Sequence, residues 1–381
     1  MARRMAVDPR FGTRLRELRG QRGLSLRDLA SLAHYGKSYV SELEIGQKRP
    51  TVEAAASLDR ALDANGELAR MVSDAADGLW TSDDEERLRY VVRDPRRVDT
   101  ATIASLQVIL AHQRRLEDNI GSAALVAPVT AELAMLERLV DEAADNDLRR
   151  DLLDTAAQWA QFAAWLSVTT GDNAGGRTRY LRAMEWATEA GNPHMVATAL
   201  SMRGHLAWMQ GRHRSMIELS KAAGWQPASL SVRAMAIQQE GRGLALVGDA
   251  RGCDDRMSRA EDMAREAAEH PDDQPPWLYF YDPNFLRMQR GVAQLYLGSQ
   301  EPSRYEQAVP LLSDALDELP SEIRHSGWVG WYLARLAPGH AALGDREAAI
   351  AVLEEARHIS EDTGTEWLRS YVERRARKLD L

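Results

Sequence analysis

The residues that most often do chemistry in proteins are scattered along this 381-residue chain. The segment Gly171–Thr178, GDNAGGRT, has the spacing of a phosphate-binding loop, but Arg177 stands where that loop needs Lys, and a helical pattern rather than a strand precedes it. Cys253 is the only cysteine, which offers neither a disulfide nor a zinc cluster. The nine histidines show no metal-ligand spacing, and no Ser–His–Asp or Cys–His arrangement is evident. The sequence therefore predicts a binding protein rather than an enzyme, with no metal and no cofactor.

Charge is divided unevenly along the chain. Residues 1–50 hold 11 Lys and Arg against 5 Asp and Glu, a balance of +6, although the whole chain carries −9. The remainder must therefore carry −15. A basic N-terminal part on an acidic body keeps the attraction for phosphate local to that part. This division makes nucleic-acid binding credible despite the negative total.

The composition is that of a globular helical protein. Apolar residues make up 44% and charged residues 28%, with only four Phe, while Ala, Leu and Arg recur throughout. No run of eighteen apolar residues occurs, and the basic N-terminus has no apolar stretch behind it. We therefore expect no membrane association and a cytoplasmic, nucleoid-associated location.

Five short helices are expected between Phe11 and Leu68. Ser25 is a good N-cap for the second of them, and Asp28 stands three residues later, where a carboxylate favours the positive helix end. Gly36 lies in the turn that follows, where we expect a positive φ. The first, third and fourth of the expected helices cover residues 13–21, 37 or 38 to 44, and 51–62. This order of short helices around a tight turn predicts a compact bundle.

The stretch Gly23–Thr51, GLSLRDLASLAHYGKSYVSELEIGQKRPT, resembles the helix-turn-helix domains of the Xre/phage-repressor family. The resemblance implies that the third helix presents its first turn to base edges in the major groove, and that neighbouring residues contact phosphates. The residues implied to read bases are Lys37, Ser38 and Ser41; those implied to lie near phosphates are Tyr39, Lys48 and Arg49, and Arg27 completes the predicted DNA-binding set.

Two features of this segment differ from what DNA binding by such a domain would favour. Leu26 stands where the family often has a Gln that contacts DNA, so base reading should rest more on the third helix. Glu42 and Glu44 on that helix would repel phosphate if they turned outward. The alternative interpretation is a small helical bundle used for protein contacts.

A spaced pattern of small residues recurs in the rest of the chain. Five amphipathic stretches each end at a Gly, and a small residue lies seven positions before that Gly. In four of these five repeat units an Ala also lies twelve positions after the Gly. The Gly positions are 171, 211, 248, 298 and 344; the small residues are Ala164, Gly204, Gly241, Gly291 and Ala337. In the fourth unit Ala315 fits only if residues 300–304 are an insertion. The pattern resembles the tetratricopeptide repeat, a pair of antiparallel helices in which the Gly ends the first helix with a left-handed turn.

These patterns predict an all-α chain in three parts. Residues 1–76 are expected to form the helix-turn-helix domain, residues 77–98 a linker with a short helix, and residues 99–381 a tetratricopeptide-like sensor domain. Two further helices are expected over 101–143, and a capping helix over 366–381.

The repeat spacing also predicts which side chains line the inner wall of the helical array. In the first three units this wall mixes aromatic and hydrogen-bonding residues: Gln158, Gln161, Trp165, Ser201, His205, Trp208, Gln238 and Arg242. Such a wall suits an extended peptide, whose backbone needs donors and acceptors. The last two units are more apolar there (Phe285, Met288, Leu295, Tyr296, Trp331), and these residues could instead pack against the capping helix.

The segment PPWLYFYDP, residues 275–283, is unusually aromatic. It could plug the superhelix beside Trp328 or Trp331, or pack a long loop onto the core, and packing is the favoured interpretation.

The combination resembles actinobacterial regulators and, more distantly, the peptide-pheromone receptors of firmicutes. That resemblance implies a sequence-specific regulator of transcription that binds double-stranded DNA as a homodimer and senses a peptide, small molecule or partner protein through its repeats. The alternative is a protein-interaction scaffold or anti-repressor in which DNA binding is secondary.

Overall fold

The computed structural model describes residues 6–7, 11–33, 35–46, 48, 50, 52–64, 66–73, 98–143, 147–319 and 323–380. The chain divides into two compact units, Met1–Arg87 and Leu88–Leu381. The predicted linker over 77–98 lies outside the described residues except for Val98, which is buried in the core of the second unit. The all-α fold class is confirmed.

The first unit contains the five expected helices around one apolar core. They are α1 (Phe11–Gln21), α2 (Leu26–Leu32), α3 (Lys37–Glu44), α4 (Val52–Leu62) and α5 (Glu67–Arg70). Two short strands that the sequence did not predict, β1 (Ala6–Val7) and β2 (Val72–Ser73), pair antiparallel. The core contains Phe11, Leu15, Leu29, Val40, Leu43 and Leu58.

The start of α2 is capped as expected. The Ser25 hydroxyl accepts from the Asp28 backbone N–H at 3.2 Å, and the Asp28 carboxylate accepts from the Ser25 N–H at 3.0 Å. The expected positive φ at Gly36 is wrong: Gly36 has φ −73° and ψ 145°, because it is the extended N-cap residue of α3. The left-handed turns lie instead at Gly23 and Gly46, with φ of 65° and 72°.

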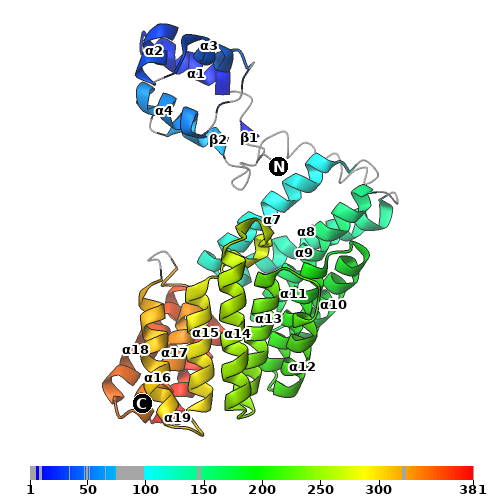
Figure 1. Ribbon diagram of the computed structural model, residues 1–381, viewed down its shortest axis with the longest axis vertical. Helices are drawn as coiled ribbons and strands as arrows, with labels where there is room; N and C mark the ends of the chain where they lie inside the picture. The colour runs from blue at the N-terminus through cyan, green and yellow to red at the C-terminus, as the bar shows by residue number, and fades with distance from the viewer. Residues whose placement is uncertain are drawn as a thin grey trace. The chain divides into compact units, whose positions relative to one another are not determined.

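The second unit is a stack of helices that lie side by side in chain order (Figure 1). It begins with α7 (Thr100–Ile120), the 3-10 turn η2 (Ser122–Leu125) and α8 (Val126–Glu142). Five helical pairs follow: α9 (Asp147–Thr169) with α10 (Asn173–Glu189), α11 (Pro193–Met209) with α12 (His213–Gly224), α13 (Leu230–Leu246) with α14 (Ala250–Ala268), α15 (Pro283–Leu297) with α16 (Ser303–Asp317), and α17 (Gly327–Ala342) with α18 (Arg346–Asp362). The terminal helix α19 (Glu366–Leu379) packs on α17 and α18, as a capping helix should.

The small residues of the repeat pattern lie where paired helices cross. A Cβ on Gly291 of α15 would stand 2.9 Å from the Leu312 Cβ of α16, and one on Gly204 of α11 would stand 3.0 Å from the Ser220 Oγ of α12. The closing Gly has a positive φ in four pairs. Gly298 is the exception and contradicts the expectation, because its φ is −55°.

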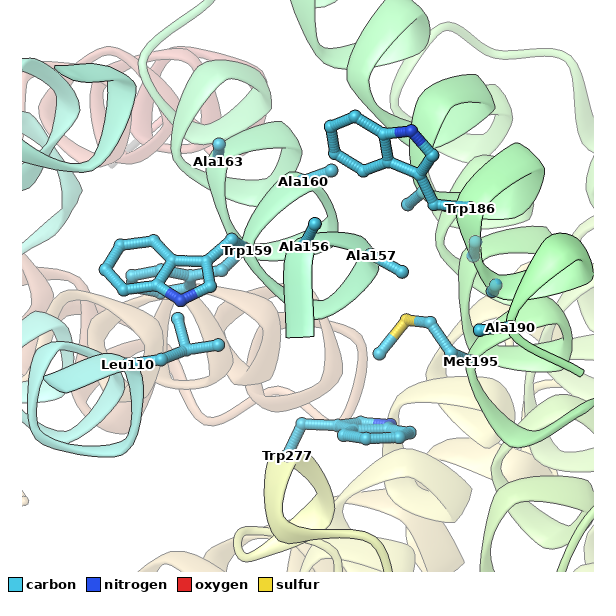
Figure 2. Close-up of a cluster of buried hydrophobic side chains, with 14 of the residues drawn as sticks. Leu110, Ala156, Ala157, Trp159, Ala160, Ala163, Trp186, Ala190, Met195 and Trp277 are labelled. Carbon is cyan, nitrogen blue, oxygen red and sulfur yellow. The ribbon is translucent and has the colours of Figure 1, made fainter. Parts of the chain in front are cut away.

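The apolar core of the second unit joins helices from several pairs. Figure 2 shows small residues of α9, among them Ala156 and Ala160, with Trp159 turned toward Leu110 of α7 and Trp277 below them. Trp159 is fully buried. These contacts anchor α7 and the aromatic segment to the repeat array.

The 3-10 turn η3 (Pro271–Asp273) precedes the aromatic segment over 275–283, and the 3-10 turn η4 (Pro276–Leu278) lies within it. Trp277, Leu278 and Tyr281 are buried in the core, and the Trp277 indole N–H donates to the Thr198 hydroxyl of α11 at 3.0 Å. Tyr279 donates to the Asp118 carboxylate of α7 at 2.6 Å. Core packing is therefore the observed role. No helix in the described parts of the chain has both the length and the apolar character needed to cross a bilayer.

Candidate nucleic-acid interface and ligand cluster

The third helix of the first unit is held against α1 by a very close backbone approach. A Cβ on Gly12 would stand 2.5 Å from the Leu43 carbonyl oxygen and 2.8 Å from that of Glu44. Only Gly allows α1 to approach the C-terminal end of α3 this closely. The sequence pattern did not single out Gly12, because nothing local marks a contact made by a distant helix.

Glu44 turns inward and does not face an approaching phosphate. Its side chain is 2% exposed, and its carboxylate accepts from Arg19 at 2.6 and 2.9 Å and from Arg16 at 3.3 Å. Arg19 also donates to the Leu24 carbonyl oxygen at 2.9 Å. The hydrogen bond to Glu44 raises the pKa of Arg19. Glu44 thus joins α3 to α1 and removes one of the two predicted objections to DNA binding.

The first turn of α3 presents polar side chains to solvent. Lys37 and Ser38 are exposed, Ser41 is half-buried one turn later, and Arg27 is exposed in the first turn of α2. Together they give one exposed, positively charged rim around the start of α3. The arrangement can donate hydrogen bonds to acceptors on a neighbouring surface.

Beyond this rim, Tyr39 and Lys48 lie together. The Lys48 ammonium is 2.7 Å from the Glu42 carboxylate and 5.6 Å from the centre of the Tyr39 ring, which in turn contacts the Tyr35 ring at 5.1 Å. Glu42 therefore carries its own counter-ion. The predicted site residue Arg49 lies outside the described residues.

The segment that resembles a phosphate loop forms the start of α10. The Asp172 carboxylate accepts from the Gly175 backbone N–H at 2.8 Å, which places a negative charge where an anion would have to bind.

Aromatic side chains from three of the repeat pairs meet in one place. The His205 ring of α11 is 5.7 Å from the Trp165 ring of α9 and 4.9 Å from the Trp208 ring. Trp208 contacts Trp331 of α17 edge-on at 5.7 Å. Because α11 and α17 belong to repeat pairs far apart in the chain, the array curls until their side chains touch. We call this group, with the polar residues beside it, the central cluster.

Polar residues of α13, α15 and α17 complete the central cluster. The Arg242 guanidinium bonds His205 Nδ1 and the Gln289 side-chain oxygen, both at 3.2 Å, and lies 4.7 Å from the centre of the Trp208 ring. Gln238 donates to the same Gln289 oxygen at 3.0 Å, and Gln289 donates to the Tyr332 hydroxyl. Burial, followed by the positive charge of Arg242, lowers the pKa of His205 to about 3. His205 is therefore neutral at physiological pH.

Arg335 of α17 also belongs to the central cluster, and sequence reasoning missed it. Its guanidinium carbon lies between 4.7 and 5.8 Å from the centres of four aromatic rings: Trp331, Tyr371, Tyr296 and Trp208. One signal could have found it. The position two residues before the small residue is polar in three successive pairs, as Gln239, Gln289 and Arg335.

Five of the eight residues predicted to line the inner wall of the first three units come together in this cluster: Trp165, His205, Trp208, Gln238 and Arg242. Ser201 is fully buried and accepts from Gln239 at 2.7 Å, beside the cluster. Gln161 is buried on α9, one helical turn before Trp165, without a ring or hydrogen-bond contact to the cluster.

Comparison with known proteins identifies the first unit. Residues 10–71 match the family model of a helix-turn-helix domain. A 45-residue stretch is 49% identical to the HTH-type transcriptional regulator DdrOP3 of Deinococcus deserti; it covers 12% of this chain and 35% of that protein. The chain thus matches about a third of the length of this relative. The first unit is a helix-turn-helix domain.

Solved structures with several helical repeats are distantly similar to the chain. A Rap protein complexed with competence and sporulation factor is 13% identical, with 94% of this chain and 99% of that chain covered and a TM-score of 0.46. PlcR of Bacillus thuringiensis, in complex with the peptide PapR7 and DNA, is 13% identical over 81% and 94% of the two chains, with a TM-score of 0.33. ComR of S. thermophilus, in complex with DNA and its signalling peptide ComS, is 10% identical over 97% and 100%, with a TM-score of 0.36. Similarity at this level says nothing about a ligand of this chain.

Proposed function

We propose that the chain is a sequence-specific DNA-binding regulator of transcription, in which the repeat unit binds a ligand that controls the binding of DNA. The observation that carries the proposal is the first turn of α3. Lys37 and Ser38 are exposed there, and Glu44 is turned into the domain by Arg19. A recognition helix reads base edges with this turn, and turning Glu44 inward removes one negative charge that would repel the phosphates of the duplex.

We assign DNA-binding roles to single residues from the resemblance of Gly23–Thr51 to Xre/phage-repressor domains, and the exposure of Arg27, Lys37 and Ser38 supports these roles. Lys37, Ser38 and Ser41 contact base edges, while Arg27, Tyr39, Lys48 and Arg49 contact phosphates. Contacts to phosphates strengthen binding to every DNA sequence, whereas contacts to base edges choose among sequences. A homodimer would place two such domains on half-sites about 34 Å apart, one turn of the duplex.

The proposed sensor is the central cluster, because it joins the first, second, third, fourth and fifth repeat pairs. A ligand that separates or tightens these pairs changes the curvature of the whole array, and a change in the array can alter the spacing of two domains in a dimer. The ligand can be a peptide, a small molecule or a partner protein. It changes the occupancy of DNA only if it binds one curvature of the array more tightly than the other.

Selection of duplexes from a random library by the full-length protein tests the proposal, followed by footprinting on the selected sequence. Replacing Lys37 and Ser41 by Ala should abolish the footprint while the helical circular-dichroism signal is kept. A surface variant in the repeat unit, Arg265→Ala on α14, should footprint as the unmodified protein does. A footprint that survives the double substitution contradicts the assignment of α3.

The alternative function, a protein scaffold or anti-repressor with secondary DNA binding, makes a different prediction. The selection would then return no common sequence, and affinity would not depend on the duplex chosen. The closely held α1–α3 geometry, which leaves the first turn of α3 exposed, favours the DNA-binding regulator.

A further inference from the structure

Three donor groups of the central cluster each have a buried polar atom that makes no hydrogen bond to the described residues. These atoms are Nε of Arg242, Nε of Arg335 and the hydroxyl oxygen of Tyr296, while beside the cluster the side-chain oxygen of Gln239, an acceptor, is unpaired as well. A buried donor without an acceptor costs free energy. Arg335 lies over the Tyr296 ring at 5.1 Å, and both arginines lie over the Trp208 ring, at 4.7 and 5.8 Å. The cluster therefore leaves two guanidinium groups beside one indole ring with donors that have no acceptor in the parts of the chain that the structure describes.

The same place lacks negative charge. Among the described residues, neither Arg242 nor Arg335 forms an ion pair, and Arg242 is only 3% exposed. The buried carboxylate of the same helix, Glu240, is already neutralised by Arg256 at 3.0 Å. Burial and the charge of Arg335 both lower the pKa of Arg242. Two like charges near one indole repel each other unless an anion lies between them.

We propose that Arg242 and Arg335 bind the carboxylate of an organic ligand whose apolar part lies against Trp208 and Trp331. The proposal deepens the proposed function, because it names the chemical class that the sensor binds. A planar guanidinium matches a planar carboxylate with two parallel hydrogen bonds, and the Tyr296 hydroxyl supplies a third donor. The indole rings supply the apolar surface that a hydrated inorganic anion would not use.

A carboxylate suits the site better than a phosphate monoester does. A phosphate carries close to two negative charges at neutral pH and costs more to remove from water. The cluster is largely aromatic, with Trp208 and Trp331 in contact, and aromatic rings offer no hydrogen-bond donors to the second charge of a dianion. A single negative charge also leaves the cation–π contacts of the arginines in place.

The competing explanation is that the four rings around Arg335 hold it as a structural cation with no ligand. Cation–π contacts do stabilise a guanidinium. They leave the Nε donors of Arg335 and Arg242 without acceptors, however, and they do not offset the repulsion between the two charges. The two explanations differ in what happens when Arg335 loses its charge.

The test titrates the full-length protein, without DNA, with N-acetyl-L-phenylalanine and with its neutral amide, and follows the fluorescence of the protein's tryptophans. The acid should change the fluorescence and saturate, and the amide should bind at least on the order of 30-fold more weakly. Acetyl-Ala-Ala-Phe and its C-terminal amide form a second pair. Saturation by the single amino acid identifies a small organic acid as the ligand class, whereas saturation by the peptide acid alone identifies a peptide C-terminus.

Two variants complete the test. Arg335→Gln should weaken binding of the acid on the order of 30-fold and leave the Tm without probe unchanged or higher, because one of two like charges is gone. Arg375→Gln is the matched control: Arg375 lies over the Tyr371 ring at 5.2 Å, and its Nε already bonds the Tyr371 hydroxyl at 3.0 Å. This variant should bind the acid as the unmodified protein does.

Three results would overturn the proposal. Equal affinity for acid and amide removes the role of the carboxylate. Saturation by 2-phenylethyl phosphate but not by either acid replaces the carboxylate by a phosphate. A Tm that falls sharply in Arg335→Gln, with no binding of any probe to the unmodified protein, leaves Arg335 as a structural cation. None of these results affects the duplex selection described above, so the proposed DNA-binding function and the carboxylate site stand or fall separately.

Discussion

The helix-turn-helix unit and the central cluster of the repeat unit use arginine in opposite ways. In the helix-turn-helix unit, Arg19 is bound by the buried carboxylate of Glu44, and Arg14 is bound by Glu67. In the central cluster of the repeat unit, Arg242 and Arg335 have aromatic rings and amides around them but no carboxylate among the described residues. Arginines that are bound by carboxylates fix the fold, whereas the two cluster arginines carry charges that no carboxylate in the described part of the chain neutralises. The difference separates the residues that hold the proposed DNA-reading surface from those proposed to sense a ligand.

Removing the carboxylate that pairs with Arg19 should have the largest effect on stability. Glu44→Ala leaves Arg19 without its carboxylate and should lower the free energy of unfolding of the first unit by about 3 kcal/mol. The control is Glu17→Ala, since Glu17 is 53% exposed and pairs with Arg14 at the surface, so its loss should cost about 0.5 kcal/mol or less. Hydrogen exchange of α1 and α3 in the full chain, followed over a urea series, measures both. Equal effects of the two substitutions would show that Glu44 does not hold α3.

The close approach between α1 and α3 should be the next most sensitive feature. Gly12→Ala forces a Cβ against two backbone carbonyl oxygens and should cost about 2 kcal/mol in the same measurement. Gly20 lies on the same helix with nothing within 4 Å of an added Cβ, so Gly20→Ala should stabilise the unit by roughly 0.5 kcal/mol. If both substitutions shift stability in the same direction, the contact of Gly12 with α3 is not tight.

The repeat unit should lose stability in acid, because His205 is buried as a neutral side chain beside Arg242. The pKa of His205 is lowered to about 3 by burial and by Arg242, while an unfolded chain has His near 6.5. The unfolded state therefore binds the proton first, and stability should fall as the pH drops below about 6.5 and continue to fall toward about 3. His205→Gln keeps an acceptor for Arg242 and should flatten this decline. Identical pH profiles of Tm for variant and unmodified protein would contradict the burial of a neutral His205.

The smallest expected effect concerns Lys48 at the edge of the DNA-reading surface. Lys48→Ala should weaken binding to all duplexes about equally and reduce the slope of log affinity against log salt by about 1, because one phosphate contact is lost. Lys221 is a matched lysine that also lies over an aromatic ring, Trp225, at 5.3 Å. Lys221→Ala should leave the slope unchanged. A change in sequence preference with Lys48→Ala would move this residue from phosphate to base contact.

Local signals in the sequence predicted the helices of both units. Ser25 and Asp28 mark the start of α2 because their side chains satisfy backbone N–H groups of the helix end itself. The repeated small residues and glycines predicted the helical pairs for the same reason. A short pairing such as β1 with β2 has no comparable signal, since it joins residues about 65 positions apart through two residues each.

The two glycines whose φ was wrongly predicted show what a sequence pattern leaves open. Gly298 stands in the repeat pattern, but its φ is negative, and an added Cβ would stand 2.5 Å from the Tyr305 ring. Its missing side chain makes room for an aromatic ring and is not needed for a turn. Gly36 serves as an extended N-cap. A glycine can be required for either reason, and only the surrounding packing decides.

The candidate ligand site was predictable in part. Repeat spacing identified Trp165, His205, Trp208, Gln238 and Arg242, because they occupy positions of successive first helices that the spacing turns toward the inner wall. It did not identify Arg335, since the contact between α11 and α17 depends on the curvature summed over three repeat pairs. Small rotations between pairs set that curvature, and no local sequence pattern records them.

Sequence reading by α3 is tested most directly by the affinity of the full-length protein for its selected duplex and for a scrambled duplex of the same composition, each measured over a salt series. The selected duplex should bind roughly 10³-fold or more tightly at physiological salt, and both affinities should fall as salt rises. Equal affinities for the two duplexes across the series would contradict the claim that α3 reads DNA sequence.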